Sequence, residues 1–359
     1  MINLSLQRYA FFALAAAFLF GASTPFAKLL LGDLPPLALA GLLYLGSGLG
    51  LLAVHVVRRL LPATAPGSNE PPLAGHDYLW LAGAILSGGV VAPVLLMWGL
   101  AGTGASEASL LLNLESVVTM LVAAFLFREA VGGRVWVAAV LMLAAALVLS
   151  WQPQADLKLS LHSAAIVGAC ICWALDNNLT RKISASDPLS LAMIKGLAAG
   201  SFNLALAFAL GMRFPATAPL VGALVLGFLG YGISLVLFIL ALRHLGTART
   251  AAHFSTAPFI GAAIAIFVLG EPFALPFGAA LTLMLAATWL VLTERHAHEH
   301  GHERMAHSHR HTHDEHHQHS HQGDEGPEPH AHRHEHAPMA HSHPHLPDLH
   351  HRHKHEKTS

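Results

Sequence analysis

Long runs of apolar residues dominate the first 295 positions of the chain. Ten runs are each about 20 residues long and are bounded by charged residues, proline or glycine. A helix of about 20 apolar residues crosses the roughly 30 Å hydrocarbon core of a bilayer. Each run is apolar around its whole circumference, which is typical of a helix surrounded by lipid or by other apolar helices. We therefore predict ten membrane-spanning helices, at residues 9–31, 35–57, 78–100, 106–127, 134–151, 161–180, 187–210, 219–242, 247–269 and 275–293.

The overall composition supports an all-α integral membrane protein and argues against a soluble enzyme. Hydrophobic residues make up 54% of the chain and charged residues 11%, whereas soluble domains have about 25% charged residues. The 20 Lys and Arg residues are balanced by 21 Asp and Glu residues, so no basic excess points to a nucleic-acid partner. No P-loop and no nucleophile with a base at a readable spacing is present, so we expect no enzymatic activity.

The basic residues between the predicted spans indicate an orientation. If the N-terminus is cytoplasmic, ten Lys and Arg residues fall in cytoplasmic connections and three in the opposite ones. Such a bias is typical of cytoplasmic loops. We therefore expect a multi-pass protein of a bacterial inner membrane, with both termini in the cytoplasm.

The two halves of the apolar region resemble each other. A shift of 142 residues aligns Leu100–Glu129 with Leu242–Glu271, so that Gly104 meets Gly246 and the terminal glutamates coincide. A repeat of five spans, an odd number, places its copies in opposite orientations. Inverted repeats of this kind are found in secondary transporters, with the substrate site between the halves. We therefore divide the chain into repeats at 1–151 and 152–295, followed by a tail at 296–359.

Several segments resemble a known family. They are ASEASLLLNLESVVTMLVAAFLFRE, CWALDNNLTRK, DPLSLAMIKGLAAG and GYGISLVLFILALRHLGTARTA. In their order and sequence they resemble the drug/metabolite transporter superfamily, and within it the ten-helix EamA-type transporters. The resemblance implies two inverted five-helix repeats, cytoplasmic termini and a central cavity lined by the first, third and fourth helices of each half. Ser116 stands where the family usually has proline, whereas Pro258 keeps the proline of the second half, so we expect the two fourth helices to bend unequally.

Glu115 is the most informative polar residue within the predicted spans. It lies near the middle of the fourth span, where low dielectric disfavours a charged carboxylate. Glu115 is therefore a candidate proton acceptor, with a structural, hydrogen-bonded carboxyl as the alternative. In a continuous helix Glu107 shares its face, while Asn113 lies on another face.

In the second half, His253 and Thr256 lie on one face of the ninth span. They are candidates for the substrate or proton pathway, with hydrogen bonding between helices as the alternative. Asp176 and Asn177 lie near the cytoplasmic end of the sixth span. We expect Asp176 either to contact a cationic substrate or to pair with the adjacent Arg181 and Lys182.

Other residues of the spans are weaker candidates. Trp98 and Tyr231 fit the apolar wall of a small-molecule site. Lys195 lies close enough to a predicted span end to extend its amine to the cytoplasmic surface. Glycines at matching places in the third and eighth spans favour close helix contact and flexibility; they are Gly88, Gly89, Gly227, Gly230 and Gly232.

The tail has a different composition from the rest of the chain. It contains 23 of the 28 histidines, many in His-X-His runs, and almost no large apolar residues, so we expect it to be disordered. Neutral imidazoles bind nickel, zinc, cobalt and copper, and a flexible chain can gather several around one ion. The candidate metal ligands are His296, His298, His300, His302, His307, His309, His311, His313, His330, His332, His334 and His336.

Together these features predict a secondary transporter that exports a small organic metabolite or drug by alternating access, with proton coupling through Glu115 as one option. One alternative is a transporter of divalent nickel, cobalt, zinc or copper whose tail collects or senses the metal. Another is a membrane metal sensor that does not transport. The expected partners are the lipid bilayer, a small-molecule substrate and divalent metal ions on the tail. No cofactor is required, and the oligomeric state is left open.

Overall fold

A computed structural model provides the structure of the chain. It describes residues 4–60, 75, 77–127, 133–150, 160–183, 186–212, 217–245, 250, 253–293, 297–302, 305–311, 330–336 and 339–344.

The first half of the chain is helical over the five predicted spans. Two of these spans are interrupted, the third by a π-helical segment and the fourth by a turn. The elements are α1 (Leu4–Leu30), α2 (Pro36–Leu60), α3 (Asp77–Ala84), η1 (Ile85–Val91), α4 (Ala92–Ala101), α5 (Ala105–Leu111), α6 (Leu114–Phe127) and α7 (Gly133–Ser150).

The second half repeats this pattern, again with a π-helical segment in its third span. Its elements are α8 (Leu161–Lys182), α9 (Pro188–Ala209), α10 (Thr217–Gly227), η2 (Phe228–Ile233), α11 (Ser234–Leu245), α13 (Ala257–Phe267) and α14 (Leu275–Leu292). Five stretches of the described chain are long and apolar enough to cross a bilayer as single helices, and shorter apolar helices accompany them. The prediction of an all-α membrane protein is confirmed.

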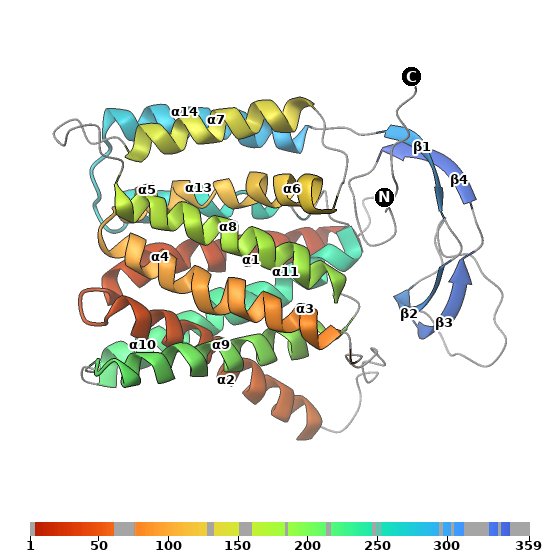
Figure 1. Cartoon of the computed structure of the whole chain (residues 1–359), viewed down its shortest axis with the longest axis horizontal. Helices are drawn as coiled ribbons and strands as arrows, with labels where there is room; N and C mark the ends of the chain where they lie inside the picture. Colours follow the sequence, from red (N-terminus) through yellow and green to blue (C-terminus); the bar gives the residue numbers. More distant parts are fainter. Residues whose placement is uncertain are drawn as a thin grey trace.

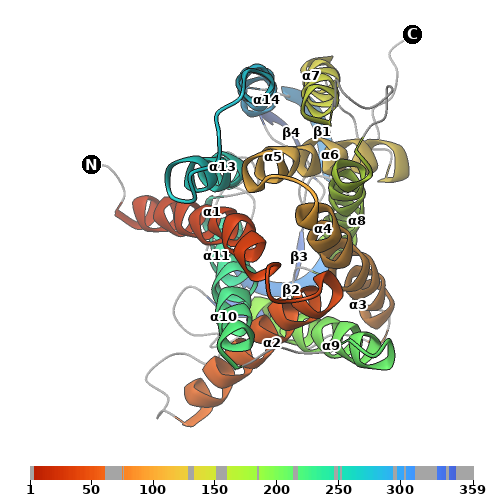
Figure 2. The same cartoon turned by 90° about the vertical axis from the view of Figure 1, so that its left-hand side faces the viewer.

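The two halves pack against each other in a pseudo-two-fold arrangement. Equivalent helices form direct pairs, α2 with α9, α5 with α13 and α7 with α14, and the last two pairs are visible side by side in Figures 1 and 2. Other contacts occur twice, once in each direction between the halves. The third span of the first half packs with α4 on α8, the first helix of the second half, and the third span of the second half packs with α11 on α1. This arrangement agrees with the sequence repeat, since each half offers the other the same surfaces.

Glycines bring α2 and α9 into close contact. Gly41 lies against Leu204, and Gly48 lies against Gly196 and Leu197, so the two helices run antiparallel. A Cβ added at Gly196 would lie 2.6 Å from the backbone nitrogen of Gly48, which leaves no room for a larger residue. The α2–α9 contact therefore depends on small residues in both halves.

The π-helical segments lie at the glycines that the sequence placed in matching positions. A π turn disturbs the regular helical hydrogen bonding, and in η1 side chains from other helices use the carbonyls. The amide of Asn203 donates to the Gly89 and Val90 carbonyls at 3.3 and 3.4 Å. The first π turn is therefore held by the opposite half of the molecule.

Both fourth helices are interrupted near their middle, although only the second has a proline there. In the first half the helix ends at Leu111 and resumes at Leu114, and the Ser116 hydroxyl donates to the Asn113 carbonyl at 2.9 Å. In the second half the Thr256 hydroxyl donates to the His253 carbonyl at 2.6 Å. The fourth helix of the first half is thus interrupted without a proline, and a hydroxyl that bonds back to the chain accompanies the interruption in each half. Unequal bending of the two helices stays a prediction.

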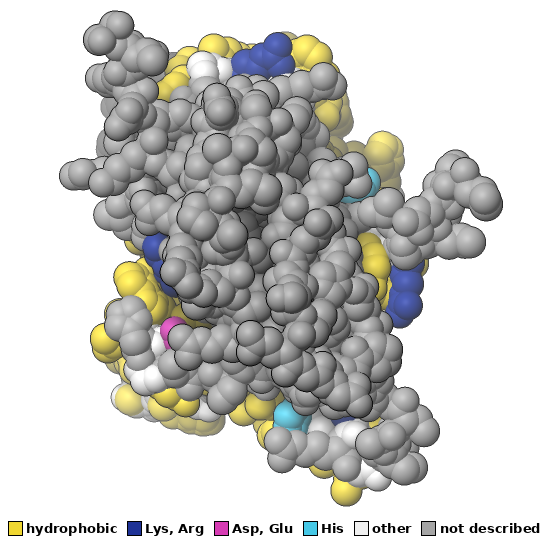
Figure 3. Space-filling view, turned by 90° about the vertical axis from the view of Figure 1, so that its right-hand side faces the viewer, with side chains coloured by type: hydrophobic (Ala, Val, Ile, Leu, Met, Phe, Trp, Pro, Cys, Tyr) yellow, Lys and Arg dark blue, Asp and Glu magenta, His cyan; other side chains and the backbone are white. Residues whose placement is uncertain are grey.

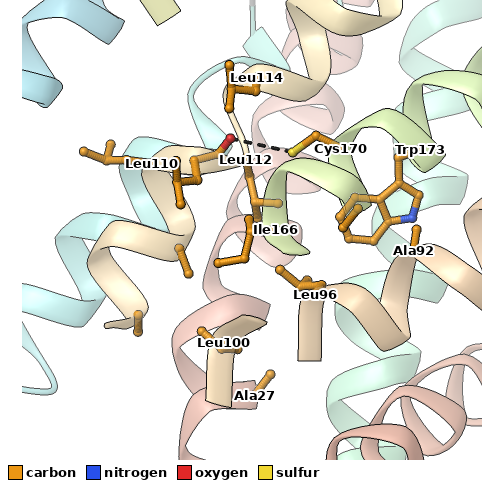
Figure 4. Close-up of a cluster of buried hydrophobic side chains, with 14 of the residues drawn as sticks. Ala27, Ala92, Leu96, Leu100, Leu110, Leu112, Leu114, Ile166, Cys170 and Trp173 are labelled. Carbon is orange, nitrogen blue, oxygen red and sulfur yellow. Dashed lines mark hydrogen bonds between the residues drawn. The ribbon is translucent and has the colours of Figure 1, made fainter. Parts of the chain in front are cut away.

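A buried apolar cluster surrounds the first interruption (Figure 4). Leu96, Leu110 and Ile166 are fully buried in it. The thiol of Cys170 on α8 donates to the Leu111 carbonyl at 3.6 Å, next to the turn between α5 and α6. Apolar packing and one weak hydrogen bond therefore fix this turn against α8.

The described parts of the tail depart from the expected disorder. The backbone forms β1 (Ala297–His302) paired antiparallel with β4 (Met339–Pro344), and β2 (Met305–His311) paired antiparallel with β3 (His330–His336). The strands lie at one end of the helical bundle (Figure 1). Strict alternation of histidine with other residues has a period of two, which is the period of a strand. Figure 3 shows this end of the molecule, with described Lys and Arg side chains at several points of its margin.

Candidate functional site

One face of α8 carries the side chains that connect several helices. Trp173, Asp176 and Asn177 are spaced i, i+3 and i+4, so they lie on neighbouring positions of the helix surface. Each of them bonds to a different part of the molecule. Trp173 bonds to η1, Asp176 to α9 and Asn177 to α6. This face of α8 is therefore where the two halves exchange polar contacts.

Glu115, the predicted proton acceptor, lies in the first turn of α6 and is partly buried. Its Oε1 accepts a hydrogen bond of 2.9 Å from the amide of Asn177. The same amide lies 3.4 Å from the Thr119 hydroxyl. Because Asn177 is neutral, this bond orients the Glu115 carboxyl but does not neutralise the charge of the ionised carboxylate.

Asp176 forms a buried ion pair with Lys195 of α9 and also accepts from the Thr180 hydroxyl at 2.9 Å. The side chains of Asp176 and Lys195 are 5% and 12% exposed. The two sequence expectations for these residues are corrected. Asp176 pairs with Lys195 of the next helix, a partner that the sequence did not suggest, and Lys195 points to that carboxylate instead of the surface. The reason is that a buried charge is stabilised by an opposite charge at hydrogen-bond distance.

An aromatic cluster adjoins these polar groups. Phe20 of α1 is its centre, with ring centroids 6.2 Å from Trp173, 5.9 Å from Tyr231 and 5.6 Å from Phe254. Tyr44 of α2 lies 5.5 Å from Tyr231. These five rings come from both halves and are spaced as interacting aromatic pairs usually are.

Tyr44 joins the aromatic cluster to the polar groups. Its hydroxyl donates to the Gly88 carbonyl at 2.6 Å, and the Trp173 indole donates to the same carbonyl at 2.9 Å. Tyr44 is also close enough to Asp176 and Glu115 for electrostatic interaction. The helices that supply these residues, α1, α2 and α8, stand around the middle of the bundle in Figure 2. We call Phe20, Tyr44, Glu115, Trp173, Asp176, Asn177, Lys195, Tyr231 and Phe254 the central cluster.

The structure does not bring all the sequence candidates into the central cluster. Trp98 is 43% exposed on α4 and stacks on His162, with ring centroids 4.6 Å apart. Asn113 is buried, and its amide lies 3.9 Å from the sulfur of Met284 on α14. Trp98 therefore lies against His162 in the first turn of α8, eleven positions before Trp173, and Asn113 lies against α14.

Glu107 belongs to α5 and Glu115 to α6, so the expected shared face of one helix is interrupted between them. Glu107 lies instead within electrostatic range of Glu271. His253 and Thr256 precede α13. The Thr256 hydroxyl donates to the His253 carbonyl. His253 is next to Phe254, which places it beside the aromatic cluster along the chain.

A second set of polar contacts, made by Lys28 and Glu271, lies at one end of the bundle. The ammonium of Lys28 donates to the carbonyls of Leu100 and Thr103 at 2.6 and 2.7 Å, where α4 ends. The Glu271 carboxylate accepts from the backbone amides of Ala105 and Ser106 at 2.6 and 2.8 Å, where α5 begins. A distant side chain thus caps each of these two helix ends. Glu129, the repeat partner of Glu271, lies outside the described residues.

The charge environment of Glu271 favours its ionised form. Burial by itself would raise the pKa of this carboxyl, but the hydrogen bonds from Ser106 and Ala105 and the charge of Lys28 outweigh burial. The pKa of Glu271 therefore lies below its ordinary value.

Sequence reasoning found part of the central cluster and missed the rest. Glu115, Asp176, Asn177 and Tyr231 were candidates, because polar groups within apolar runs are conspicuous. Lys195 gave the same signal, but its partner on α8 was not readable from the sequence. The aromatic residues Phe20, Tyr44, Trp173 and Phe254 were missed, because an aromatic residue in an apolar run looks the same whether it lines a site or only packs.

The predicted metal ligands are all in the tail. Ten of them belong to the described strands, whereas His296 and His313 lie outside the described residues. In the part of the chain whose side chains are described, no three His, Cys, Asp or Glu residues are grouped as metal ligands would be.

Comparison with known proteins agrees with this architecture. A family model described as EamA-like transporter family matches twice, at residues 7–151 and 162–293. A protein of Methanothermobacter thermautotrophicus, described as an uncharacterized transporter, is 26% identical over 293 residues, which cover 77% of this chain and 84% of the relative. One crystal structure matches with a TM-score of 0.55 and 17% identity over 80% of this chain and 98% of the other, a likeness of fold. Two copies of the family pattern coincide with the two helical halves that enclose the central cluster, and the chain is therefore a multi-pass membrane transporter that belongs to the EamA-like transporter family.

Proposed function

We propose that the chain exports a small organic solute across a bacterial cytoplasmic membrane by alternating access, and that Glu115 exchanges a proton during the cycle. The observation that carries this proposal is the position of Glu115. Its carboxyl is hydrogen-bonded to Asn177 of the other half and stands within the central cluster. A group at a contact between two inverted repeats experiences the rearrangement that switches access from one side to the other.

The charges of the central cluster favour this role for Glu115 over Asp176. Asp176 is neutralised by Lys195, and the pair also ties α8 to α9. The neutral Asn177 leaves Glu115 free to change its charge without breaking an ion pair. Protonation of Glu115 would therefore alter the contact between α6 and α8 at low energetic cost.

The aromatic rings indicate the kind of solute. Phe20, Tyr231 and Phe254 present apolar ring surfaces to one another, and Tyr231 lies within electrostatic range of the Glu115 carboxyl. Apolar walls with a few polar groups are usual for small-molecule sites, and a cation can interact with both ring faces and a carboxylate. The proposed substrate therefore has an apolar or aromatic body, and a positively charged group would suit the carboxyl.

The test is transport by purified protein in proteoliposomes under an imposed proton gradient. The panel contains aromatic amino acids, lipophilic organic cations and divalent metal salts, each measured with the wild type and with Glu115→Gln. We expect proton-driven movement of an organic compound by the wild type and a loss of at least about tenfold in the variant, since a general proton-transfer group typically contributes about 10²-fold or more.

A matched control removes a different carboxyl. Asp33→Asn changes an exposed residue of the α1–α2 connection by the same chemistry, and its transport should equal that of the wild type. Wild-type rates from Glu115→Gln with the same gradient would remove Glu115 from the mechanism. Movement of metal ions without any organic solute would favour the metal-transport alternative, and no movement of any compound would favour the sensor.

A further inference from the structure

The proposed transport cycle makes no use of Lys28 and Glu271, whose contacts lie at one end of the helical bundle. Figure 2 looks onto this end, with the tail strands behind the bundle. If access alternates, the two halves must separate at each end in turn. A gate at this end therefore presupposes the alternating access proposed above, and it needs contacts between the halves that can be broken.

Helices of both halves hold the turn between α4 and α5 at residues 102–104. Lys28 of α1 bonds to carbonyls before and within this turn, and Glu271, which follows α13, bonds to the amides after it. On α8, the Nδ1 atom of His162 lies 3.1 Å from the Trp98 carbonyl oxygen of α4. In Figure 2, α4 lies beside α8 and α5 beside α13. Since α8 and α13 belong to the second half, this turn is a point where the two halves meet.

The contacts at this turn are easier to break than those between α2 and α9. The backbones of Gly48 and Gly196 are in direct contact, and separating them would leave a gap between two apolar helices. Lys28 and Glu271, in contrast, are only partly buried. Water can replace the hydrogen bonds of such groups, so breaking these bonds has a small net cost. This end can therefore open while α2 and α9 stay together.

Gly104 allows the Glu271 carboxylate to approach the backbone. A Cβ added at Gly104 would lie 3.3 Å from Oε2 of Glu271, which is tighter than ordinary contact. Lys28 is within electrostatic range of the same carboxylate. The cation lies where α4 ends and the carboxylate where α5 begins, so the dipoles of both helices favour the closed arrangement.

We propose that Glu271 and Lys28 form a gate that closes this end of the transport pathway and must open for the solute to pass. With the orientation predicted from the loop charges, this end faces away from the cytoplasm and is the exit side of an exporter.

Two buried threonines provide matched reporters of opening. Thr103 lies in the α4–α5 turn and is 6% exposed, and Thr288 lies on α14 and is 8% exposed. Neither hydroxyl has a hydrogen-bond partner among the described residues, so Thr→Cys breaks no side-chain hydrogen bond there. Each cysteine is placed singly in the full chain, in which Cys170→Ser and Cys172→Ala remove the native thiols.

The labelling rate with a sulfonated, water-soluble maleimide in detergent micelles measures opening. With Glu271 and Lys28 in place, Thr103→Cys should react slowly but to completion, because the gate opens transiently. Adding Glu271→Gln or Lys28→Met should make this reaction at least about fivefold faster, since losing a helix cap typically shifts an equilibrium by about that factor. The rate of Thr288→Cys should stay unchanged.

The matched control is Glu107→Gln. Glu107 lies in the first turn of α5 and within electrostatic range of Glu271, so this variant removes a carboxylate from the same end and leaves both helix ends capped. Its labelling of Thr103→Cys should be no faster than with Glu107 in place.

Four results would overturn the gate. Equal Thr103→Cys rates with and without Glu271→Gln would show that the contact does not close this end. Faster labelling of both reporters would indicate general loosening, and equal acceleration by Glu107→Gln would indicate a nonspecific effect of charge. No labelling of Thr103→Cys with Glu271 and Lys28 in place would show a permanent joint. The transport assay with Glu115→Gln reports the solute and the proton separately, so its failure would leave a gate confirmed by labelling in place.

Discussion

Asp176 and Lys195 illustrate what a single buried charge requires in this protein. Each would be costly to bury alone, and together they form an ion pair between α8 and α9 that is almost fully enclosed. Thr180 provides Asp176 with a further hydrogen bond. The pair therefore holds two helices together beside Glu115 without contributing net charge.

Removing one partner should be worse than removing both. Lys195→Met leaves a buried carboxylate without its cation, which typically costs about 3–5 kcal/mol, whereas a double change to Lys195→Met and Asp176→Asn leaves no charge. We expect a lower apparent unfolding temperature for the single variant and substantial recovery in the double variant. Thermal unfolding of the purified proteins in detergent measures this, and equal midpoints for the two variants would contradict the ion-pair account.

At the scale of elements, the ends of α4 and α5 depend on residues that are remote in the sequence. Gly104 precedes α5 and has no side chain to cap it. The Glu271 carboxylate takes the place of a local cap, and Lys28 from α1 satisfies carbonyls at the end of α4. The end of α4 is thus completed by another helix of the same half, and the start of α5 only when the second half is assembled.

This capping should give the protein a specific response to acid. The folded-state pKa of Glu271 lies below its ordinary value of 4.5, so its contribution to stability is complete above that value and is lost as the pH falls through the lowered pKa. We expect the wild type to unfold at a higher temperature than Glu271→Gln at about pH 6, with the difference shrinking toward about pH 3. Unfolding midpoints of both proteins across this range provide the measurement. A difference that stays constant with pH would mean that the charge of Glu271 does not matter.

The π-helical segments show the same dependence on the assembled fold. The glycines of η1 and η2 were visible in the sequence as matching positions, but glycine alone does not specify a π turn. In η1, Tyr44, Trp173 and Asn203 arrive from three other helices and donate to the carbonyls. The glycines permit the turn, and the neighbouring side chains stabilise it.

At the scale of the whole molecule, two copies of one five-helix unit exchange equivalent surfaces. The direct pairing of α2 with α9, and of α7 with α14, follows from this symmetry. The side chains of the two halves are not equivalent. The polar contacts of the central cluster are made by α8, with α9 through the ion pair and with α6 through Glu115. The centre of the aromatic cluster is Phe20 of α1. The central cluster therefore combines polar groups of α6, α8 and α9 with aromatic rings from both halves.

The charge bias of the loops predicts the orientation of the whole chain. A fluorescent protein that folds only in the cytoplasm should be active when fused to either terminus, because an even number of spans places both ends on one side. Alkaline phosphatase, which needs an oxidising compartment, should be active when fused after Gly211 in the α9–α10 connection and inactive at the termini. Phosphatase activity at the C-terminus would contradict the predicted orientation.

The sequence by itself determined the membrane-spanning helices and the repeat, and it singled out Glu115 as a candidate. These features depend on local properties, namely long apolar runs, a recurring order of glycine and glutamate, and a charged group inside an apolar segment. The same local reading placed Lys195 at the surface and overlooked Tyr44 and Trp173, because the sequence does not show which helices become neighbours.

Only the tertiary structure decided the partners. Asp176 with Lys195, Glu115 with Asn177, and Glu271 with the first amides of α5 join residues that are 19, 62 and more than 160 positions apart. In the tail, the register of the strands decided which histidines are opposed. The physical reason is the same in each case: a polar group removed from water must find a partner, and that partner is set by the packing of the elements and not by the neighbouring sequence.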